Sequence, residues 1–173
     1  MFQALIQVQS LILGMGVLLA GSGLLATLLG LRAAEEGFSD GIIGLIMSAF
    51  YLGYVIGTLL IPRLIRRAGH IRTFAALAAI SSAAAIMHGL WVEPWVWVVL
   101  RLINGVTLLG LYMVIESWLN TRASSHRGQI FGTYMMVSLF AYGAGQFLIG
   151  IHGPMEVATF AIVALLFSCL LYT

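Results

Sequence analysis

The chain has 173 residues, of which 61% are hydrophobic and 8% charged, and its mean hydropathy is +1.06. A soluble domain carries about 25% charged residues, so this composition excludes an ordinary soluble fold and predicts a protein whose solvent is lipid. The net charge of +2 says little about partners, whereas the positions of the arginines along the chain are informative.

Six mostly apolar runs follow one another along the chain, each close to the roughly 20 residues that a transmembrane helix needs. They comprise residues 7–31, 41–61, 73–90, 95–119, 128–151 and 157 to the C-terminus. The first run is too long, and too poor in Lys and Arg, for a signal peptide. We therefore expect an all-α, polytopic membrane protein with six transmembrane helices.

Charged residues gather in the breaks between these runs, and the two signs are separated. The first, third and fifth breaks hold the acids Glu35, Glu36, Asp40, Glu93 and Glu156 and the single arginine Arg32. The second and fourth hold Arg63, Arg66, Arg67, Arg72, Arg122 and Arg127 and no acid. Because cationic loops stay in the cytoplasm during insertion, both termini are predicted to be cytoplasmic.

Small and aromatic residues suggest how the spans pack. The second run contains "GYVIG", Gly53 to Gly57, and small residues at this spacing let helices approach closely in a membrane. We expect this face to pack within the chain rather than to form a dimer. Trp91, Trp95 and Trp97 flank the third break, a placement typical of an interfacial aromatic belt.

Arg101 is the sharpest candidate functional residue. It lies about two turns into the fourth run, with Asn104 and Gly105 on the next turn. A charge at the centre of a span costs about 2.5 to 3.5 kcal/mol. Arg101 either extends to the outer interface, or faces the bundle interior, where it contacts an anionic substrate group or a proton-carrying carboxylate.

Glu116 lies near the cytoplasmic end of the same run. Fifteen residues at about 1.5 Å each place it more than roughly 20 Å from Arg101, so the two side chains cannot pair. We expect Glu116 to pair with Arg66, Arg67 or Arg127 and to act as a gate or latch.

A polar stripe marks the fifth run, where Tyr134, Ser138, Tyr142 and Gln146 recur every four residues on one slowly drifting face. The stripe either lines an aqueous cavity or forms hydrogen bonds between helices. Tyr51 and Tyr54 form a similar, less regular face on the second run.

The sequence lacks the patterns of enzymes and cofactor sites. His70, His88, His126 and His152 all fall in or beside breaks, without metal-ligand spacing, and we interpret them as solvated. No phosphate-binding loop, catalytic triad or paired carboxylate within a span is present. The basic loop has no interleaved aromatic residues. We expect no enzyme activity, no cofactor, no metal site and no nucleic-acid partner.

Two motifs resemble a known family. The second break ends in R-x-G-x-x-R ("RAGHIR"), and the fourth run opens with Arg-x-x-x-Gly. With six spans, these features resemble the N-terminal half of a major facilitator superfamily (MFS) transporter. The stretches "GFSDGIIGLIMSAFYLGYVIGTLLIPRLIRRAGHIRTFAAL" and "LYMVIESWLN" are most similar to its YcaD-like bacterial branch. The resemblance covers nearly the whole chain and implies a bacterial inner membrane.

The resemblance also implies roles for single residues. In the family's loop motif G-x-x-x-D-R-x-G-R-R, which helps to latch the cytoplasmic side, Arg67 and Gly69 match, whereas Pro62 and Arg66 replace the glycine and the aspartate. The implied cytoplasmic gate comprises Arg63, Arg66, Arg67, Gly69, Arg72 and Glu116. The fourth-helix motif, kept as Arg101, Asn104 and Gly105, is associated with proton coupling. Gln146 stands where the antiporter motif of the fifth helix has proline, so antiport is not supported.

The family's permeases have twelve spans in two halves, with the solute site between them. This chain would be one half, which either pairs with itself or a second subunit or lacks its C-terminal half. Its last five residues, "CLLYT", are what the codons TGT CTC TTA TAC ACA would encode, and that string resembles a transposon end used in sequencing libraries. We therefore expect a reading frame truncated in or near the sixth span, with residues 169–173 derived from an adapter.

The function predicted is secondary active transport of an unidentified small solute by alternating access, with the lipid bilayer, the solute and a second half as partners. The predicted substrate or proton pathway consists of Arg101, Asn104, Tyr134, Ser138, Tyr142, Gln146, Tyr51 and Tyr54. The alternatives are a membrane scaffold or regulatory subunit that transports nothing, in which the arginine loop contacts anionic lipid, and an inactive fragment.

Overall fold

The computed structural model describes the backbone of residues 2–122 and 127–169, and the side chains of residues 9–121 and 127–169. The predicted all-α fold is confirmed. The elements are α1 (Phe2–Glu35), α2 (Asp40–Ala68), α3 (His70–Leu90), α4 (Pro94–Arg122), α5 (Arg127–Phe147), the single 3-10 turn η1 (Leu148–Gly150) and α6 (Val157–Ser168). Of the described helices, α1 to α4 are long and apolar enough to cross a membrane, whereas α6 is apolar but shorter.

Some of the residues in these predictions lie outside the part of the chain that the structure describes. The segment proposed to derive from an adapter, residues 169–173, lies outside the described part except for Cys169, and so do the side chain of Arg122 and all of His126.

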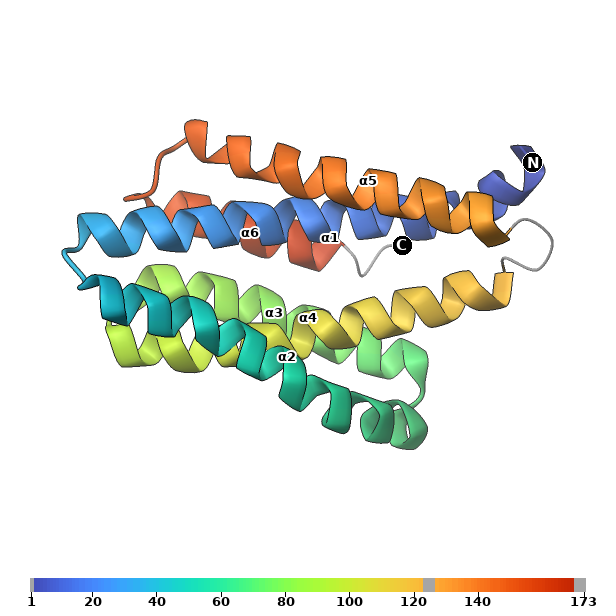
Figure 1. The fold of residues 1–173 in the computed structure, drawn as a ribbon, viewed down its shortest axis with the longest axis horizontal. Helices are drawn as coiled ribbons and strands as arrows, with labels where there is room; N and C mark the ends of the chain where they lie inside the picture. Colours follow the sequence, from blue (N-terminus) through green and yellow to red (C-terminus); the bar gives the residue numbers. More distant parts are fainter. Residues whose placement is uncertain (1, 123–126, 170–173) are drawn as a thin grey trace.

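The six helices form one elongated bundle with alternating directions (Figure 1). The N-terminus, the junction of α2 and α3, the end of α4 and the start of α5 lie at one end of the bundle. The closest packing joins α2 to α4, α4 to α3, α3 to α6, α6 to α1 and α1 to α5. Helices α2 and α5 are therefore the first and last members of this packing order.

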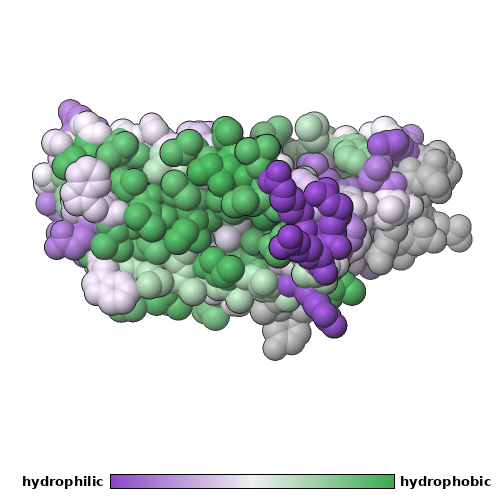
Figure 2. All heavy atoms as spheres, turned by 90° about the horizontal axis from the view of Figure 1, so that it is seen from below, coloured by the Kyte–Doolittle hydropathy of each residue, from purple (hydrophilic) through white to green (hydrophobic). Residues whose placement is uncertain are grey.

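The outer surface of α2 combines an apolar face with a charged end. Leu52, Val55, Leu59 and Leu60 are exposed along the helix, as a lipid-facing surface requires. Arginines at the end of α2 and the start of α3 are exposed beyond them: Arg63, Arg66, Arg67 and Arg72. Figure 2 shows this side of the bundle as an apolar surface that ends at a strongly hydrophilic cluster.

Glycines bring the backbones of α2 and α4 together. A Cβ atom added at Gly53 would lie 2.0 Å from the carbonyl oxygen of Leu102, and one added at Gly105 would lie 2.0 Å from that of Phe50. At Gly57 an added Cβ would lie 3.3 Å from the Cα of Val106. The "GYVIG" face therefore packs within the chain, as predicted, because only glycine leaves room for the other helix.

A second pair of glycines does the same for α1 and α5. A Cβ atom at Gly23 would lie 2.1 Å from the carbonyl oxygen of Tyr142, and one at Gly145 would lie 2.0 Å from that of Ala20. Each of the two crossings thus has glycine on both helices, and each sets the separation of a helix pair that flanks the centre of the bundle.

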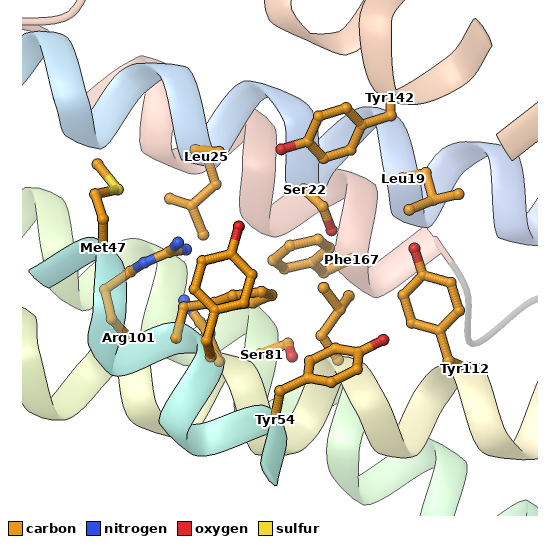
Figure 3. A pocket seen from close by; sticks show the side chains of 15 residues that line it. Leu19, Ser22, Leu25, Met47, Tyr54, Ser81, Arg101, Tyr112, Tyr142 and Phe167 are labelled. Atoms are coloured by element: carbon orange, nitrogen blue, oxygen red, sulfur yellow. The ribbon is translucent and has the colours of Figure 1, made fainter. Parts of the chain in front are cut away.

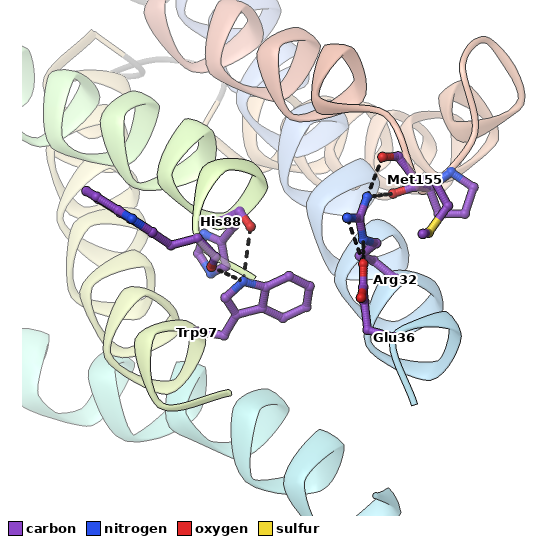
Figure 4. A network of polar contacts seen from close by, with 7 residues as sticks. Arg32, Glu36, His88, Trp97 and Met155 are labelled. Carbon is purple, nitrogen blue, oxygen red and sulfur yellow. Dashed lines mark hydrogen bonds and ion pairs between the residues drawn. The ribbon is translucent and has the colours of Figure 1, made fainter. Parts of the chain in front are cut away.

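The third break differs from its prediction. Trp91 and Trp95 are exposed, but Trp97 has no exposed surface, and its Nε1 donates to the carbonyl oxygens of His88 (3.0 Å) and Trp91 (2.9 Å). The expectation that His88 is solvated is also wrong, because it is fully buried and its Nδ1 lies 2.7 Å from the carbonyl oxygen of Ala84. Figure 4 shows His88 beside Trp97, whose indole donates to its carbonyl oxygen. Proximity to a break does not set which way a helical side chain points.

Arg32 also lies inside the structure rather than in the first break. It is a buried residue of α1, and its guanidinium binds Glu36 at 2.7 Å. The same group donates to the carbonyl oxygens of Pro154, at 3.3 Å, and of Met155 (Figure 4). These contacts join the end of α1 to the loop that precedes α6.

We expect the Arg32→Gln substitution to lower the free energy of unfolding by about 2 kcal/mol, because hydrogen bonds to a charged group are worth about 1.5 to 3 kcal/mol. Thermal unfolding in detergent measures the change, and hydrogen exchange should rise in residues 151–156. Arg63→Gln is the matched control, since Arg63 is exposed and, among the described residues, it bonds only to the carbonyl oxygen of Leu59 on its own helix. Equal effects of the two substitutions would contradict the role given to Arg32.

Candidate solute-binding cavity

A cavity of about 360 Å³ lies at the centre of the bundle, within the size range of small-molecule sites. Every helix contributes to its wall. The lining residues are Leu19, Ser22, Leu25 and Ala26 of α1; Met47, Phe50, Tyr51 and Tyr54 of α2; Ser81 of α3; Arg101, Asn104, Leu108 and Tyr112 of α4; Tyr142 of α5; and Phe167 of α6 (Figure 3).

Arg101 points into this cavity. Only 6% of its surface is exposed, and Figure 3 shows its guanidinium group directed toward Leu25 of α1. The guanidinium carbon lies 4.5 Å from the ring centroid of Phe50, and Nε makes no hydrogen bond to any described residue. The structure thus places the residue inside the bundle and not at a lipid-facing surface.

Asn104 shares this wall, one turn along α4 from Arg101. It is 4% exposed, and within the described chain neither its amide oxygen nor its amide nitrogen has a hydrogen-bond partner. Buried polar atoms are nearly always paired. The cavity therefore holds three buried polar atoms, one from Arg101 and two from Asn104, that are available to a ligand.

The remaining wall is aromatic and neutral. Four tyrosines and two phenylalanines line the cavity, and none of the described lining side chains is acidic. Ser81 bonds to Thr107 at 2.6 Å, and Ser22 donates to the carbonyl oxygen of Leu18 at 3.0 Å, so both serine hydroxyls are already satisfied. Arg101 gives the lining its single formal charge.

The four residues of the predicted polar stripe on α5 do not all line the cavity. Tyr142 lines the cavity, but Tyr134 is buried elsewhere and its hydroxyl donates to Oε1 of Glu116 at 3.0 Å. Ser138 is half-buried, with a hydroxyl that has no partner in the described chain, and Gln146 is exposed. A step of four residues exceeds one turn by about 40°, so the first and last residues of the stripe differ in direction by about 120°.

Tyr51 and Tyr54 of the second predicted face both line the cavity. The lining residues that the sequence analysis did not name include the polar residues Tyr112 and Ser81. Tyr112 follows Arg101 by eleven residues, which is close to three full turns, so its place on the same face could have been inferred. Ser81 lies among the small residues of α3, where no pattern distinguishes it.

The predicted gate residues lie toward one end of the bundle but form no network of ion pairs. The ion pairs of the described chain join Arg32 to Glu36 and His152 to Glu156, so none joins Glu116 to an arginine. Arg63, Arg66, Arg67 and Arg72 are all exposed. Gly69 ends α2 with a φ of 82°, a conformation that favours glycine.

We expect Tyr134→Phe to lower the free energy of unfolding by about 1 kcal/mol, since it removes the hydrogen bond to Glu116. Tyr142→Phe is the matched control on the same helix, because the Tyr142 hydroxyl makes no hydrogen bond to a described residue. Thermal unfolding of the two variants in detergent gives the comparison. A control that loses as much as Tyr134→Phe would show that the bond to Glu116 contributes nothing.

Comparison with known proteins agrees with this architecture. The family model described as Major Facilitator Superfamily matches residues 11–173. An MFS-type transporter of Enterobacter sp. (strain 638) is 33% identical over 140 residues, and the MFS-type transporter YcaD of Salmonella arizonae is 31% identical over 143 residues. These matches cover 80% and 82% of this chain and 37% of each relative.

The fold is also similar to that in the crystal structure of the nucleoside transporter NupG, with a TM-score of 0.84 and 15% sequence identity. The match covers 95% of this chain and 42% of that structure. The chain thus spans less than half the length of each of these proteins, and its six helices correspond to one half of the NupG fold.

Proposed function

Because the chain belongs to the major facilitator superfamily, a family of membrane transporters and not of enzymes, we propose that it supplies one half of a permease that moves a small solute by alternating access. The chain is a multi-pass membrane protein of the N-terminal half type, similar to YcaD. The observation that carries the proposal is the central cavity, where polar atoms of Arg101 and Asn104 have no hydrogen-bond partner among the described residues.

The proposal assigns roles by position. Arg101 and Asn104 bind the solute or respond to a proton, and Tyr51, Tyr54 and Tyr142 line the path of the solute through the cavity. Ser138 and Gln146 lie outside the cavity and receive no role. The cytoplasmic gate consists of Arg63, Arg66, Arg67, Gly69 and Arg72 with Glu116, to which Tyr134 is bonded.

The orientation and the partner are also part of the proposal. The end of the bundle that carries Arg63, Arg66, Arg67, Arg72 and Arg127 faces the cytoplasm of a bacterium, because cationic ends are retained there. A second half, whether in the same polypeptide or in another subunit, covers the cavity. The lengths of the relatives support this, since the chain spans 37% of each.

Cysteine accessibility tests alternating access. With Cys169→Ser as background, Tyr142→Cys introduces one thiol at the cavity, and a membrane-impermeant maleimide is applied to right-side-out or inside-out vesicles of cells that express the chain. We expect labelling from both sides, because a cavity that alternates is exposed to each in turn. Phe147→Cys, at a strongly exposed α5 position outside the cavity lining, controls for general leakage.

The outcomes separate the two functional classes. Labelling of Tyr142→Cys from both sides, with Phe147→Cys labelled from one side at most, supports a permease. Absence of labelling at Tyr142→Cys from either side, or labelling from one side alone, would reject alternating access and favour a membrane scaffold or regulatory subunit.

A further inference from the structure

We propose that the central cavity binds a small aromatic monocarboxylate, with its carboxylate at Arg101 and Asn104 and its ring among the tyrosines. This inference rests on the proposed function, because it names the solute class of the same cavity. It rests on three observations: Arg101 is the single cation of the described cavity wall, the amide of Asn104 beside it has no partner in the described chain, and the rest of the wall is rich in aromatic residues.

The charge of the wall selects the charge of the ligand. Arg101 contributes the only formal charge among the described lining residues. Its guanidinium carbon lies over the face of the Phe50 ring, 4.5 Å from the ring centroid. A buried cation without an acidic partner is unfavourable, and an anion that neutralises it removes that penalty. One positive charge matches one negative charge, so a carboxylate fits better than a phosphate dianion.

The geometry selects a planar acceptor group. A guanidinium presents parallel N–H donors that match the two oxygens of a carboxylate. Asn104, one turn away, offers an amide N–H donor with no partner in the described chain, and its free amide oxygen can accept a hydrogen bond from a ring substituent. The two residues together therefore suit a carboxylate attached to a ring that carries polar groups.

The aromatic wall selects the ring. Tyr54, Tyr112 and Tyr142 line the cavity on three sides, and Figure 3 shows the hydroxyl of Tyr54 toward Tyr112 and that of Tyr112 toward Leu19. Aromatic rings favour stacked or edge-to-face contact with another ring. The volume of about 360 Å³ has room for a solute of one or two rings.

Binding of four probes tests this inference. The full chain is reconstituted in lipid nanodiscs, and displacement of radiolabelled benzoate is measured with benzoate, cyclohexanecarboxylate, benzamide and acetate, with empty nanodiscs to correct for partition into lipid. We expect benzoate to bind at least about tenfold more tightly than each of the other three. Cyclohexanecarboxylate has a ring that is not aromatic, benzamide has no charge, and acetate has no ring.

Variants assign the binding to the proposed residues. Arg101→Gln should weaken benzoate binding about 10- to 100-fold and leave benzamide unchanged, because it removes hydrogen bonds between charged groups. Arg101→Lys keeps the charge but loses the planar fork of donors, so its affinity for benzoate should lie between those of the parent chain and Arg101→Gln. Binding by this variant also shows that the site remains folded. Arg127→Gln, an exposed arginine at the start of α5, should bind benzoate as the parent chain does.

Three results would overturn the inference. Benzamide that binds as tightly as benzoate would show that charge is not recognised. Acetate that binds as tightly would mean that Arg101 is a bare cation, as expected if its natural partner is a carboxylate side chain of the second half. Failure of all four probes to bind would reject the site. Each result leaves the cysteine-accessibility test of transport independent, since that test requires no ligand.

Discussion

Alanine at Gly53 should prevent stable assembly of the bundle. An added Cβ would lie 2.0 Å from the backbone oxygen of Leu102, far inside van der Waals contact, and a backbone atom cannot move aside as a side-chain tip can. Overpacking a well-packed core costs about 1 to 3 kcal/mol even when side chains can adjust. We expect a loss of more than about 3 kcal/mol, measured by the folded fraction in size-exclusion chromatography and by thermal unfolding.

The same helix supplies the control. Gly44 has no atom within 4 Å of the position of an added Cβ. Gly44→Ala should therefore be neutral or stabilise α2 by up to about 1 kcal/mol, through higher helix propensity. If Gly53→Ala unfolds at the temperature of Gly44→Ala, the close approach of α2 and α4 is refuted.

A double variant sharpens the test. Gly105→Ala alone should destabilise as Gly53→Ala does, because it disrupts the same crossing from the other helix. The two substitutions together should cost clearly less than the sum of the separate losses, since the first has already forced the helices apart. Additive losses would mean that the two glycines act at independent sites.

The second large effect has the opposite sign. We expect Arg101→Met to raise the free energy of unfolding by about 1 to 2 kcal/mol. Burial of a charge without an acidic partner costs several kcal/mol, whereas the interaction of Arg101 with the Phe50 ring returns about 0.5 to 2 kcal/mol. The penalty exceeds the gain, and methionine of similar length fills the space.

Thermal unfolding in nanodiscs measures this change, and Arg127→Met is the control because Arg127 is exposed and should shift stability by less than about 0.5 kcal/mol. A chain that becomes more stable as it loses a buried charge keeps that charge for function. Destabilisation by Arg101→Met would instead show that the bundle itself satisfies the guanidinium.

Much of the fold was predictable because it depends on local properties of the sequence. Apolar runs and the charged breaks between them located all six helices, and α2 differs from its predicted range of 41–61 mainly by continuing through the arginines to Ala68. Helix α5 ends at Phe147, and the rest of its predicted run forms η1 and the loop that follows. A run of apolar residues marks the lipid-crossing part of a helix, whereas its backbone continues until a glycine such as Gly69 ends it.

The site was only partly predictable, because it depends on side-chain direction and on partners distant in sequence. Arg101 could be recognised as costly in a span, but its inward direction needed the positions of α1 and α2. Arg32 binds the backbone of Pro154 and Met155, and carbonyl oxygens leave no trace in residue type. Tyr134 and Tyr142 are two four-residue steps apart, and the drift of about 40° per step adds to about 80°, which gives the two side chains different surroundings.

The two glycine crossings also constrain the order of events during synthesis. The crossing of α2 and α4 joins Gly53 to Gly105, whereas that of α1 and α5 joins Gly23 to Gly145, near opposite ends of the chain. At about 5 to 20 residues per second, a ribosome adds Gly145 roughly 6 to 25 s after Gly23. During that interval the glycine face of α1 has no partner from α5, so the nascent chain must hold α1 in the membrane, against lipid or insertion factors, until α5 arrives.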